Sequence, residues 1–143
     1  MLLTDRERRF LDSRMVGHLA TASRAAVPYV VPICFAISDS TLYTTIDEKP
    51  KQRDASTLQR IKNLAENPVA SVTVDRYDDD WTRLGWVLLR GRAEILRQGE
   101  EHDHAQAVLR KRYFQLQTMR IEALPVIALR LERATSWGNL DPA

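Results

Sequence analysis

The fold is decided by residues 29–46, YVVPICFAISDSTLYTTI. Tyr29–Ile37 is continuously apolar and rich in β-branched side chains, which is typical of a strand buried on both faces. Asp39 and Ser40 then form a turn, and Thr41–Ile46 shows the alternation of a second strand. Because so short a turn can join only antiparallel strands, this stretch predicts a hairpin inside an antiparallel sheet.

Similar signals on either side of this hairpin predict four more strands and three helices. Because Pro32 cannot donate to a neighbouring strand, its own strand should lie at a sheet edge or contain a bulge. The other strands are expected at Val16–Ala22, Val69–Tyr77, Trp86–Leu96 (with Gly91 as a bulge) and Pro125–Arg133. The helices are expected from Thr4, from Ser56 and over Glu100–Gln117, the first two with capping-box partners at Glu7 and Gln59.

This order of elements favours a mainly β protein with flanking helices. Most strands follow one another through short turns, whereas a parallel doubly wound sheet needs a helix after nearly every strand. Six apolar strands of this length are expected to close, or nearly close, into a barrel. The 143 residues fit a single domain that spans residues 1–143.

Composition excludes several classes of protein. The longest apolar run, Val30–Ile37, is far shorter than a membrane span, and the charged N-terminus does not resemble a signal peptide. The one cysteine, Cys34, fits a reducing compartment, so we expect a cytoplasmic protein without membrane association. The net charge of +2 is too small to indicate nucleic-acid binding.

Several short motifs occur in an order that resembles a known family. They are His18-Leu19-Ala20-Thr21, Pro28–Ile33, Asp47-Glu48-Lys49-Pro50-Lys51, Leu58–Leu64 with Asn67-Pro68, Tyr77–Trp81, Gly91-Arg92-Ala93 and Ser136-Trp137-Gly138. Together they resemble the split-barrel flavoproteins related to pyridoxamine 5′-phosphate oxidase, most of all the branch of probable deazaflavin (coenzyme F420)-dependent enzymes. The resemblance covers Val16–Asn139. One departure is Arg24-Ala25-Ala26-Val27, where the family usually turns its first hairpin with Asp-Gly.

The resemblance implies a fold and an activity. The expected fold is a six-stranded antiparallel split β-barrel of the FMN-binding kind, assembled as a homodimer. The expected activity is hydride transfer between coenzyme F420 and a small unsaturated organic substrate that lies between the two subunits. FMN is the alternative cofactor. An alternative from another class of function is a cofactor-binding or carrier protein that does not catalyse a reaction.

A local basic cluster is the first candidate for the cofactor site. It comprises Lys49, Lys51, Arg53, Arg60 and Lys62 around the start of the second helix, where Ser56 and Thr57 add hydroxyl donors. A helix N-terminus attracts anions through its free N–H groups and its positive end. The resemblance implies that Arg60 binds the first phosphate and that Lys49-Pro50-Lys51 binds the anionic tail of F420. The alternative is a solvated basic loop.

The resemblance also assigns parts of two strands and a tryptophan near the C-terminus to the cofactor. Val30 and Pro32 would provide packing and main-chain contacts, and Tyr43, Thr44 and Thr45 would lie beside the ring, with ordinary strand residues as the alternative. Trp137 would reach the cofactor across the dimer interface, or else cap the end of the barrel.

No other catalytic group follows from the sequence. No Cys–His or Ser–His–Asp set can be assembled, the histidines are interpreted as structural, and Cys34 as a buried small hydrophobe. The run Asp78-Asp79-Asp80 lacks the spaced ligands of a calcium site, so no metal is expected. Because a flavin or deazaflavin carries the redox chemistry itself, a missing acid–base pair does not argue against an enzyme.

Overall fold

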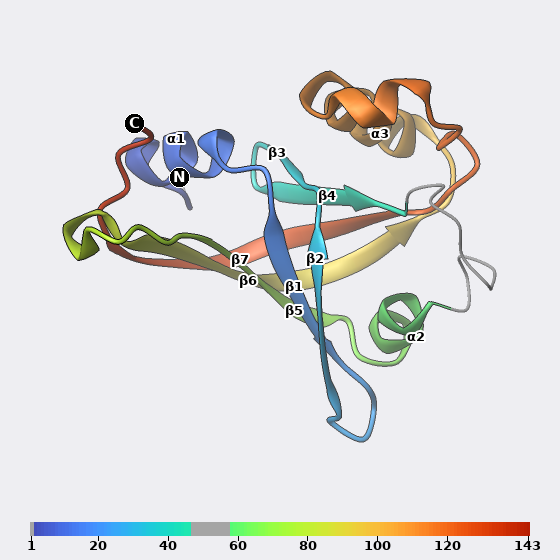
Figure 1. Ribbon diagram of the computed structural model, residues 1–143. Coiled ribbons are helices and arrows are strands. Elements are labelled where there is room, and N and C mark those ends of the chain that lie inside the picture. Colours follow the sequence, from blue (N-terminus) through green and yellow to red (C-terminus); the bar gives the residue numbers. More distant parts are fainter. Residues whose placement is uncertain (1, 47–57) are drawn as a thin grey trace.

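The computed structural model describes residues 2–46 and 58–143. Within these ranges seven strands form one antiparallel sheet in the order β2-β1-β5-β6-β7-β4-β3 (Figure 1). The strands are β1 (Gly17–Ala22), β2 (Pro28–Ile33), β3 (Ala36–Ser38), β4 (Thr41–Thr45), β5 (Val69–Arg76), β6 (Gly85–Leu96) and β7 (Val126–Gly138). The helices are α1 (Asp5–Ser13), α2 (Gln59–Glu66) and α3 (Glu100–Arg112), with 3-10 turns η2 (Trp81–Arg83) and η3 (Phe114–Thr118).

The predicted strand Tyr29–Ile37 is wrong, because this segment splits into β2 and β3 at opposite edges of the sheet. The break falls at Phe35, whose backbone N–H donates to the Tyr113 hydroxyl at 2.9 Å, while that hydroxyl donates to the Phe35 carbonyl at 3.0 Å. The Tyr113 hydroxyl thus makes the two backbone hydrogen bonds that a neighbouring strand would otherwise make with Phe35. The sheet has seven strands rather than six. As an edge strand, β2 is largely exposed instead of buried on both faces, and Pro32 has the edge position that was predicted for it.

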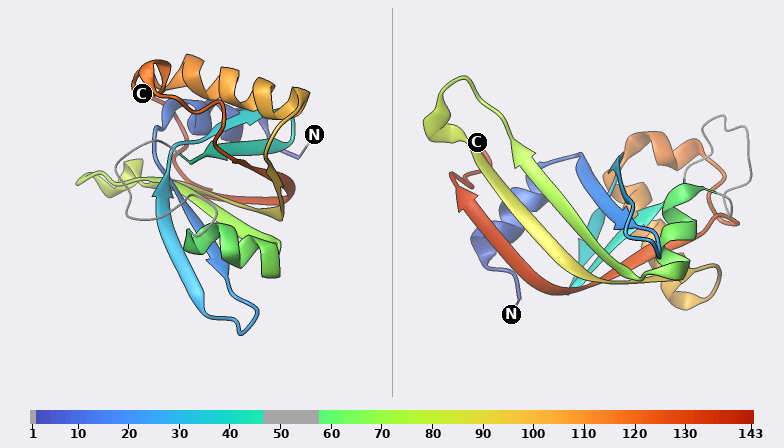
Figure 2. Two further views of the ribbon diagram at one scale, coloured as in Figure 1. Left: turned by 90° about the vertical axis from the view of Figure 1, so that its right-hand side faces the viewer. Right: turned by 90° about the horizontal axis from the view of Figure 1, so that it is seen from below.

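The sheet curls strongly without closing, as a half-barrel (Figure 2). The long β6–β7 pair joins its two halves and contains a register shift at Arg90/Gly91, where Glu132 of β7 is the extra residue. The bulge predicted at Gly91 is therefore confirmed, with the added residue on the partner strand. A Cβ on Gly91 would lie 2.0 Å from the Arg130 carbonyl oxygen, so only glycine permits this approach.

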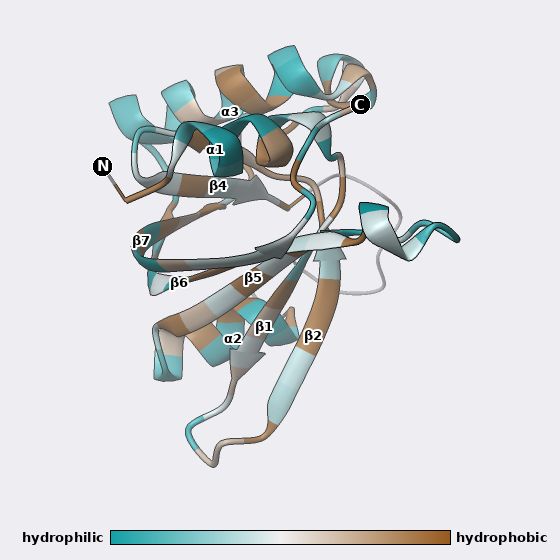
Figure 3. Cartoon of the chain, turned by 90° about the vertical axis from the view of Figure 1, so that its left-hand side faces the viewer, coloured by the Kyte–Doolittle hydropathy of each residue, from teal (hydrophilic) through white to brown (hydrophobic). Residues whose placement is uncertain are grey.

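Two apolar clusters lie on the two sides of the sheet. The larger one fills the concave side and includes Phe10 of α1, Leu89 of β6 and Ile61 of α2. The smaller one packs α3 and η3 against β4 and the start of β7, with Leu109 among its members. In Figure 3 α3 lies above β4, and brown apolar segments alternate with paler ones along β2 and β5. Of the helices in the described residues, none is long and apolar enough to cross a membrane.

The helix boundaries follow the local signals only in part. The capping box of α1 is confirmed, because Thr4 and Glu7 each accept the other's backbone N–H at 3.0 and 2.9 Å. In contrast, α2 begins at Gln59 with Leu58 as its N-cap, later than the predicted start at Ser56, and Ser56 itself lies outside the described residues. The third helix ends at Arg112, five residues before the predicted Gln117, and β7 continues past Arg133 to Gly138.

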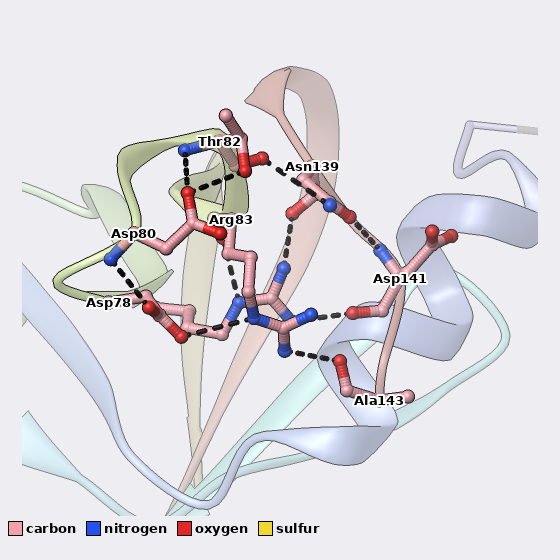
Figure 4. A network of polar contacts seen from close by, with 8 residues as sticks. Asp78, Asp80, Thr82, Arg83, Asn139, Asp141 and Ala143 are labelled. Carbon is pink, nitrogen blue, oxygen red and sulfur yellow. Dashed lines mark hydrogen bonds and ion pairs between the residues drawn. The ribbon is translucent and has the colours of Figure 1, made fainter.

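The predicted turn at Asp78–Asp80 is held by its own carboxylates (Figure 4). Asp80 caps η2 by accepting the Thr82 N–H at 3.0 Å, and Asp78 pairs with Arg83 at 3.0 Å. Below this turn the buried guanidinium of Arg76 donates to the carbonyls of Arg83, Asn139 and Asp141. The acidic run therefore stabilises the turn. The hydrogen bonds of Arg76 hold the C-terminal segment against the end of the sheet.

Candidate functional site

A cavity of about 190 Å³ lies where the curled sheet stays open, between β2 at one edge, the end of β4, α2 and η3. Its polar lining, within the part of the chain that the structure describes, is Thr44, Thr45 and Arg60. Its other lining residues are Val16, Pro32, Ile33, Cys34 and Leu116. Among the described residues, the cavity thus combines a largely apolar wall with two threonines and one arginine.

The two threonines lie at the end of β4, where pairing with β7 holds the strand in place. Thr44 is opposite Ile127 and Thr45 is opposite Val126. Both threonine side chains are buried, and the cavity is bounded by them on the side of β4. Hydroxyl groups in this position can donate to, or accept from, the polar edge of a bound molecule.

Arg60 is positioned by the packing of α2 on β1. The buried Asn63 amide donates to the Thr21 hydroxyl at 3.0 Å, and Ile61 enters the larger core cluster. These contacts place the first turn of α2, with Arg60, beside the cavity. Because the first turn contains no acidic residue and Leu58 provides no side-chain cap, the positive end of the helix adds to the charge of Arg60.

The Thr45 hydroxyl is in turn held by α3. The Gln106 amide nitrogen donates to Thr45 Oγ1 at 2.9 Å and to the Ile121 carbonyl at 2.8 Å. Gln106 is 4% exposed, and its Oε1 atom is buried without a hydrogen-bond partner in the described structure. Nothing in the sequence around Gln106 indicates this contact, because the two residues are 61 positions apart.

Four of the sequence-predicted residues meet at this cavity: Pro32, Thr44, Thr45 and Arg60. Val30 does not line it, since it lies on the edge strand β2 with 60% of its surface exposed. Lys62 is also absent from the lining and is exposed on α2. The predicted residues Lys49, Pro50, Lys51, Ser56 and Thr57 lie outside the described residues.

Tyr43 is directed away from the cavity, toward α3. Its hydroxyl donates to the Glu101 carboxylate at 2.7 Å, and Glu101 is also paired with Arg130. Burial, helped by the hydrogen bond to Glu101, raises the pKa of Tyr43 to about 12. The hydrogen bonds from Arg130 and Tyr43 lower the pKa of Glu101 to about 2. This cluster joins α3 to β4 and β7, so Tyr43 supports the strand that carries the threonines.

Trp137 is remote from the cavity of its own chain. Val126, opposite Thr45, starts β7, and Trp137 lies eleven residues further along that strand, opposite Trp86. At the usual rise of a strand this is about 35 Å. Trp137 is 54% exposed, so its ring is available at the surface. Contact between Trp137 and such a cavity would require a second chain.

Four lining residues were missed by sequence reasoning: Val16, Ile33, Cys34 and Leu116. Cys34 is half-buried at the break between β2 and β3 rather than a fully buried core residue. Leu116 was placed in the third helix, whereas it lies in η3 after the chain has turned at Tyr113. In the sequence these residues are marked only by their mostly apolar side chains. Apolar character alone does not distinguish a residue that lines a cavity from one that is buried in the core.

Comparison with known structures supports this architecture. The chain is 29% identical to an FAD-binding protein from Mesorhizobium loti over 94% of each chain, with a TM-score of 0.66. An F420 reductase is 20% identical, with 93% of this chain and 98% of that chain covered and a TM-score of 0.69. A haem-binding protein from Mycobacterium smegmatis is 22% identical with a TM-score of 0.76; 94% of this chain matches, and it spans about half (53%) of that protein.

A search among curated proteins found no match. The profile of the family described as pyridoxamine 5′-phosphate oxidase matches residues 3–138, which is nearly the whole chain. The curled antiparallel sheet with flanking helices is the structure that the resemblance implied. The chain therefore belongs to the pyridoxamine 5′-phosphate oxidase family of split-barrel proteins.

Proposed function

We propose that this chain is an oxidoreductase that binds coenzyme F420 at the Arg60 cavity and transfers a hydride to a small unsaturated organic substrate. FMN is the alternative cofactor. The observation that supports this most directly is that one cavity is lined by an arginine in the first turn of a helix and by two threonines at the end of a strand. These groups match the anionic and polar parts that the two cofactors share.

The residues fit such a cofactor part by part. Pro32, Ile33 and Leu116 offer apolar surface to a planar ring, while Thr44 and Thr45 offer hydrogen bonds to its polar edge. Arg60 is suited to a phosphate, because a guanidinium can donate two parallel hydrogen bonds. The preference for F420 rests on the sequence Lys49-Pro50-Lys51, which we propose binds the longer anionic tail.

When bound, either cofactor supplies the hydride chemistry. The role of the protein would be to bind the cofactor, to orient its ring and to exclude water from the site. The apolar lining would keep solvent from one side of the ring, the threonines would bind its polar edge, and Arg60 would bind the phosphate of the cofactor. The substrate would then approach the uncovered face of the ring.

We also propose that the working unit is a homodimer. The cavity of a single chain, about 190 Å³, is smaller than the roughly 300–1,000 Å³ typical of ligand pockets. A second chain could complete it and could bring the exposed Trp137 to the cofactor. An isologous pair with two equivalent sites is the simplest arrangement.

Titration of the purified protein with F420, FMN and haemin, followed by absorbance, tests the proposal. We expect saturable binding of F420, weaker binding of FMN and no stoichiometric binding of haemin. Haemin is included because the fold is shared with a haem-binding protein. Stoichiometric haemin binding without binding of either flavin-type cofactor would contradict the proposal. Cofactor binding without oxidation of the reduced form by any unsaturated substrate would indicate a carrier.

The choice between the two cofactors has its own test. Replacing Lys49 and Lys51 together by Ala is expected to weaken F420 binding by about 5- to 30-fold and FMN binding by less than about 2-fold, as for partly exposed ion pairs. General destabilisation would affect both cofactors alike. Equal losses would make FMN the preferred cofactor.

A further inference from the structure

We infer that Gln106 is a positioning residue of the cofactor site: it holds the Thr45 hydroxyl so that Thr45 donates its proton to an oxygen of the bound cofactor. This inference rests on the function proposed above. It adds a residue that does not line the cavity and acts only through Thr45.

The orientation of the Gln106 amide is fixed by its surroundings. Its nitrogen lies 2.8 Å from the Ile121 carbonyl oxygen and 3.4 Å from the Leu124 carbonyl oxygen. Turning the amide over would place Oε1 against these two acceptors, which is repulsive. The group that faces Thr45 is therefore the N–H donor, at 2.9 Å.

This donor decides what the Thr45 hydroxyl can do. A hydroxyl has one proton, and an oxygen that accepts from Gln106 must send that proton elsewhere. Among the described residues, the acceptors within reach are the carbonyls of Ile46 at 3.3 Å and Pro125 at 3.4 Å. Both are long for an O–H···O hydrogen bond, which is normally 2.5–3.0 Å. A ligand oxygen at ordinary distance would be the better acceptor.

The unpartnered Oε1 atom supports a role in donation. Buried polar atoms without a partner are uncommon in native structures, and each needs an explanation. Both N–H groups of Gln106 are used, by Thr45 and Ile121, whereas its carbonyl oxygen has no partner in the described residues. The two hydrogen bonds that the amide nitrogen donates therefore explain why Gln106 is buried at this position. The ligand class that fits the resulting site presents a carbonyl or phosphate oxygen to Thr45.

A double-mutant cycle tests the inference. The variants are Gln106→Met, which removes the donor at similar length, Thr45→Val, which removes the hydroxyl, and their combination. Loss of one hydrogen bond is expected to weaken F420 or FMN binding by about 10-fold in Thr45→Val and by about 3- to 10-fold in Gln106→Met. Because Gln106 acts through Thr45, the double variant should bind about as well as Thr45→Val alone.

Three controls separate positioning from a structural effect. Gln98→Met makes the same substitution at an exposed residue and should leave binding unchanged. Thr45→Ser keeps the hydroxyl and should retain binding within about 2-fold, but should lose it when Gln106→Met is added. The same cycle measured on the unfolding of the cofactor-free protein reports the Gln106–Thr45 contact independently of any ligand.

The outcomes are distinguishable. If the wild type binds neither F420 nor FMN, the proposed function fails and this inference falls with it. If the wild type binds but the losses of Gln106→Met and Thr45→Val multiply, only the inference is overturned. Non-additive losses in binding, together with coupling in the unfolding cycle, support it.

Discussion

At the scale of the residue, Ala26 carries backbone strain in the first hairpin. Its φ is 65°, in the left-handed region that side chains disfavour by about 1–2 kcal/mol. This is the turn where the family usually has Asp-Gly, and the chain keeps the hairpin through the Ser23–Val27 and Ala26–Ser23 backbone hydrogen bonds. The departure that the sequence showed is thus tolerated at a local cost.

Changing Ala26 to Gly should stabilise the protein by about 0.5–1 kcal/mol, because the relief of strain exceeds the added entropy of the unfolded chain. Urea unfolding measures this difference. Ala25→Gly is the matched control, since Ala25 is not among the positive-φ residues and the same substitution there should destabilise. Equal effects at both positions would show that the turn is unstrained.

Glu101 gives a pH-dependent prediction. Its folded pKa of about 2 lies below the ordinary value of 4.5, so its stabilising effect is present above pH 4.5 and is lost as the pH falls toward 2. Since Glu101 and Arg130 are both more than a third exposed, solvent screening limits the effect to about 1 kcal/mol. The stability difference between wild type and Glu101→Gln should therefore shrink between pH 5 and 2. A stability difference that stays constant over this range would contradict the stabilising role of Glu101.

At the scale of the element, local signals predicted features that depend on neighbouring residues. The capping box of α1, the edge position of Pro32 and the bulge at Gly91 each follow from one residue type in its immediate context. The split of Tyr29–Ile37 does not, because it depends on Tyr113, which lies 78 residues beyond Phe35. Contacts of that range leave no periodicity for a sequence pattern to report.

The same limit explains why Tyr43 was assigned to the cofactor. Four consecutive residues of β4, Leu42 to Thr45, are buried, since α3 covers one face of the strand and the core covers the other. No alternation then tells which side chains face the cavity. Thr44 and Thr45 meet Arg60 there because of the curl of the sheet and the packing of α2, neither of which is readable from spacing.

The bulge between β6 and β7 should be intolerant of any side chain. Gly91→Ala would place a Cβ 2.0 Å from the Arg130 carbonyl oxygen, and we expect a loss of about 2–3 kcal/mol of stability, as for overpacking. Gly99→Ala is the comparison, because its φ of 108° is strained but no atom lies within 4 Å of the added Cβ. Its ψ of 179° belongs to a region that is essentially restricted to glycine, so a loss of about 1–3 kcal/mol is expected there from backbone strain alone. Thermal or urea unfolding measures both losses, and unchanged stability of Gly91→Ala would contradict the close approach.

At the scale of the whole molecule, the exposed aromatic and aliphatic residues require an explanation. Val30 and Trp137 are more than half exposed, and both lie on strands of the single curled sheet. A homodimer that covers part of this surface would complete the small cavity and supply Trp137 to it. Sedimentation at micromolar concentration should therefore show a dimer, and Trp137→Ala should weaken cofactor binding without lowering stability by more than about 1 kcal/mol. A monomer that still binds the cofactor would contradict the shared site.

One matched pair of variants tests most directly whether the Arg60 cavity binds the anionic cofactor. Arg60 lines the cavity, whereas Lys62 is exposed two residues further along the same helix. Titration with F420 and FMN should show that Arg60→Ala weakens binding by about 10- to 100-fold, as for loss of a charged hydrogen bond, and that Lys62→Ala changes it by less than about 2-fold. Unchanged affinity in Arg60→Ala, or equal losses in the two variants, would contradict the site.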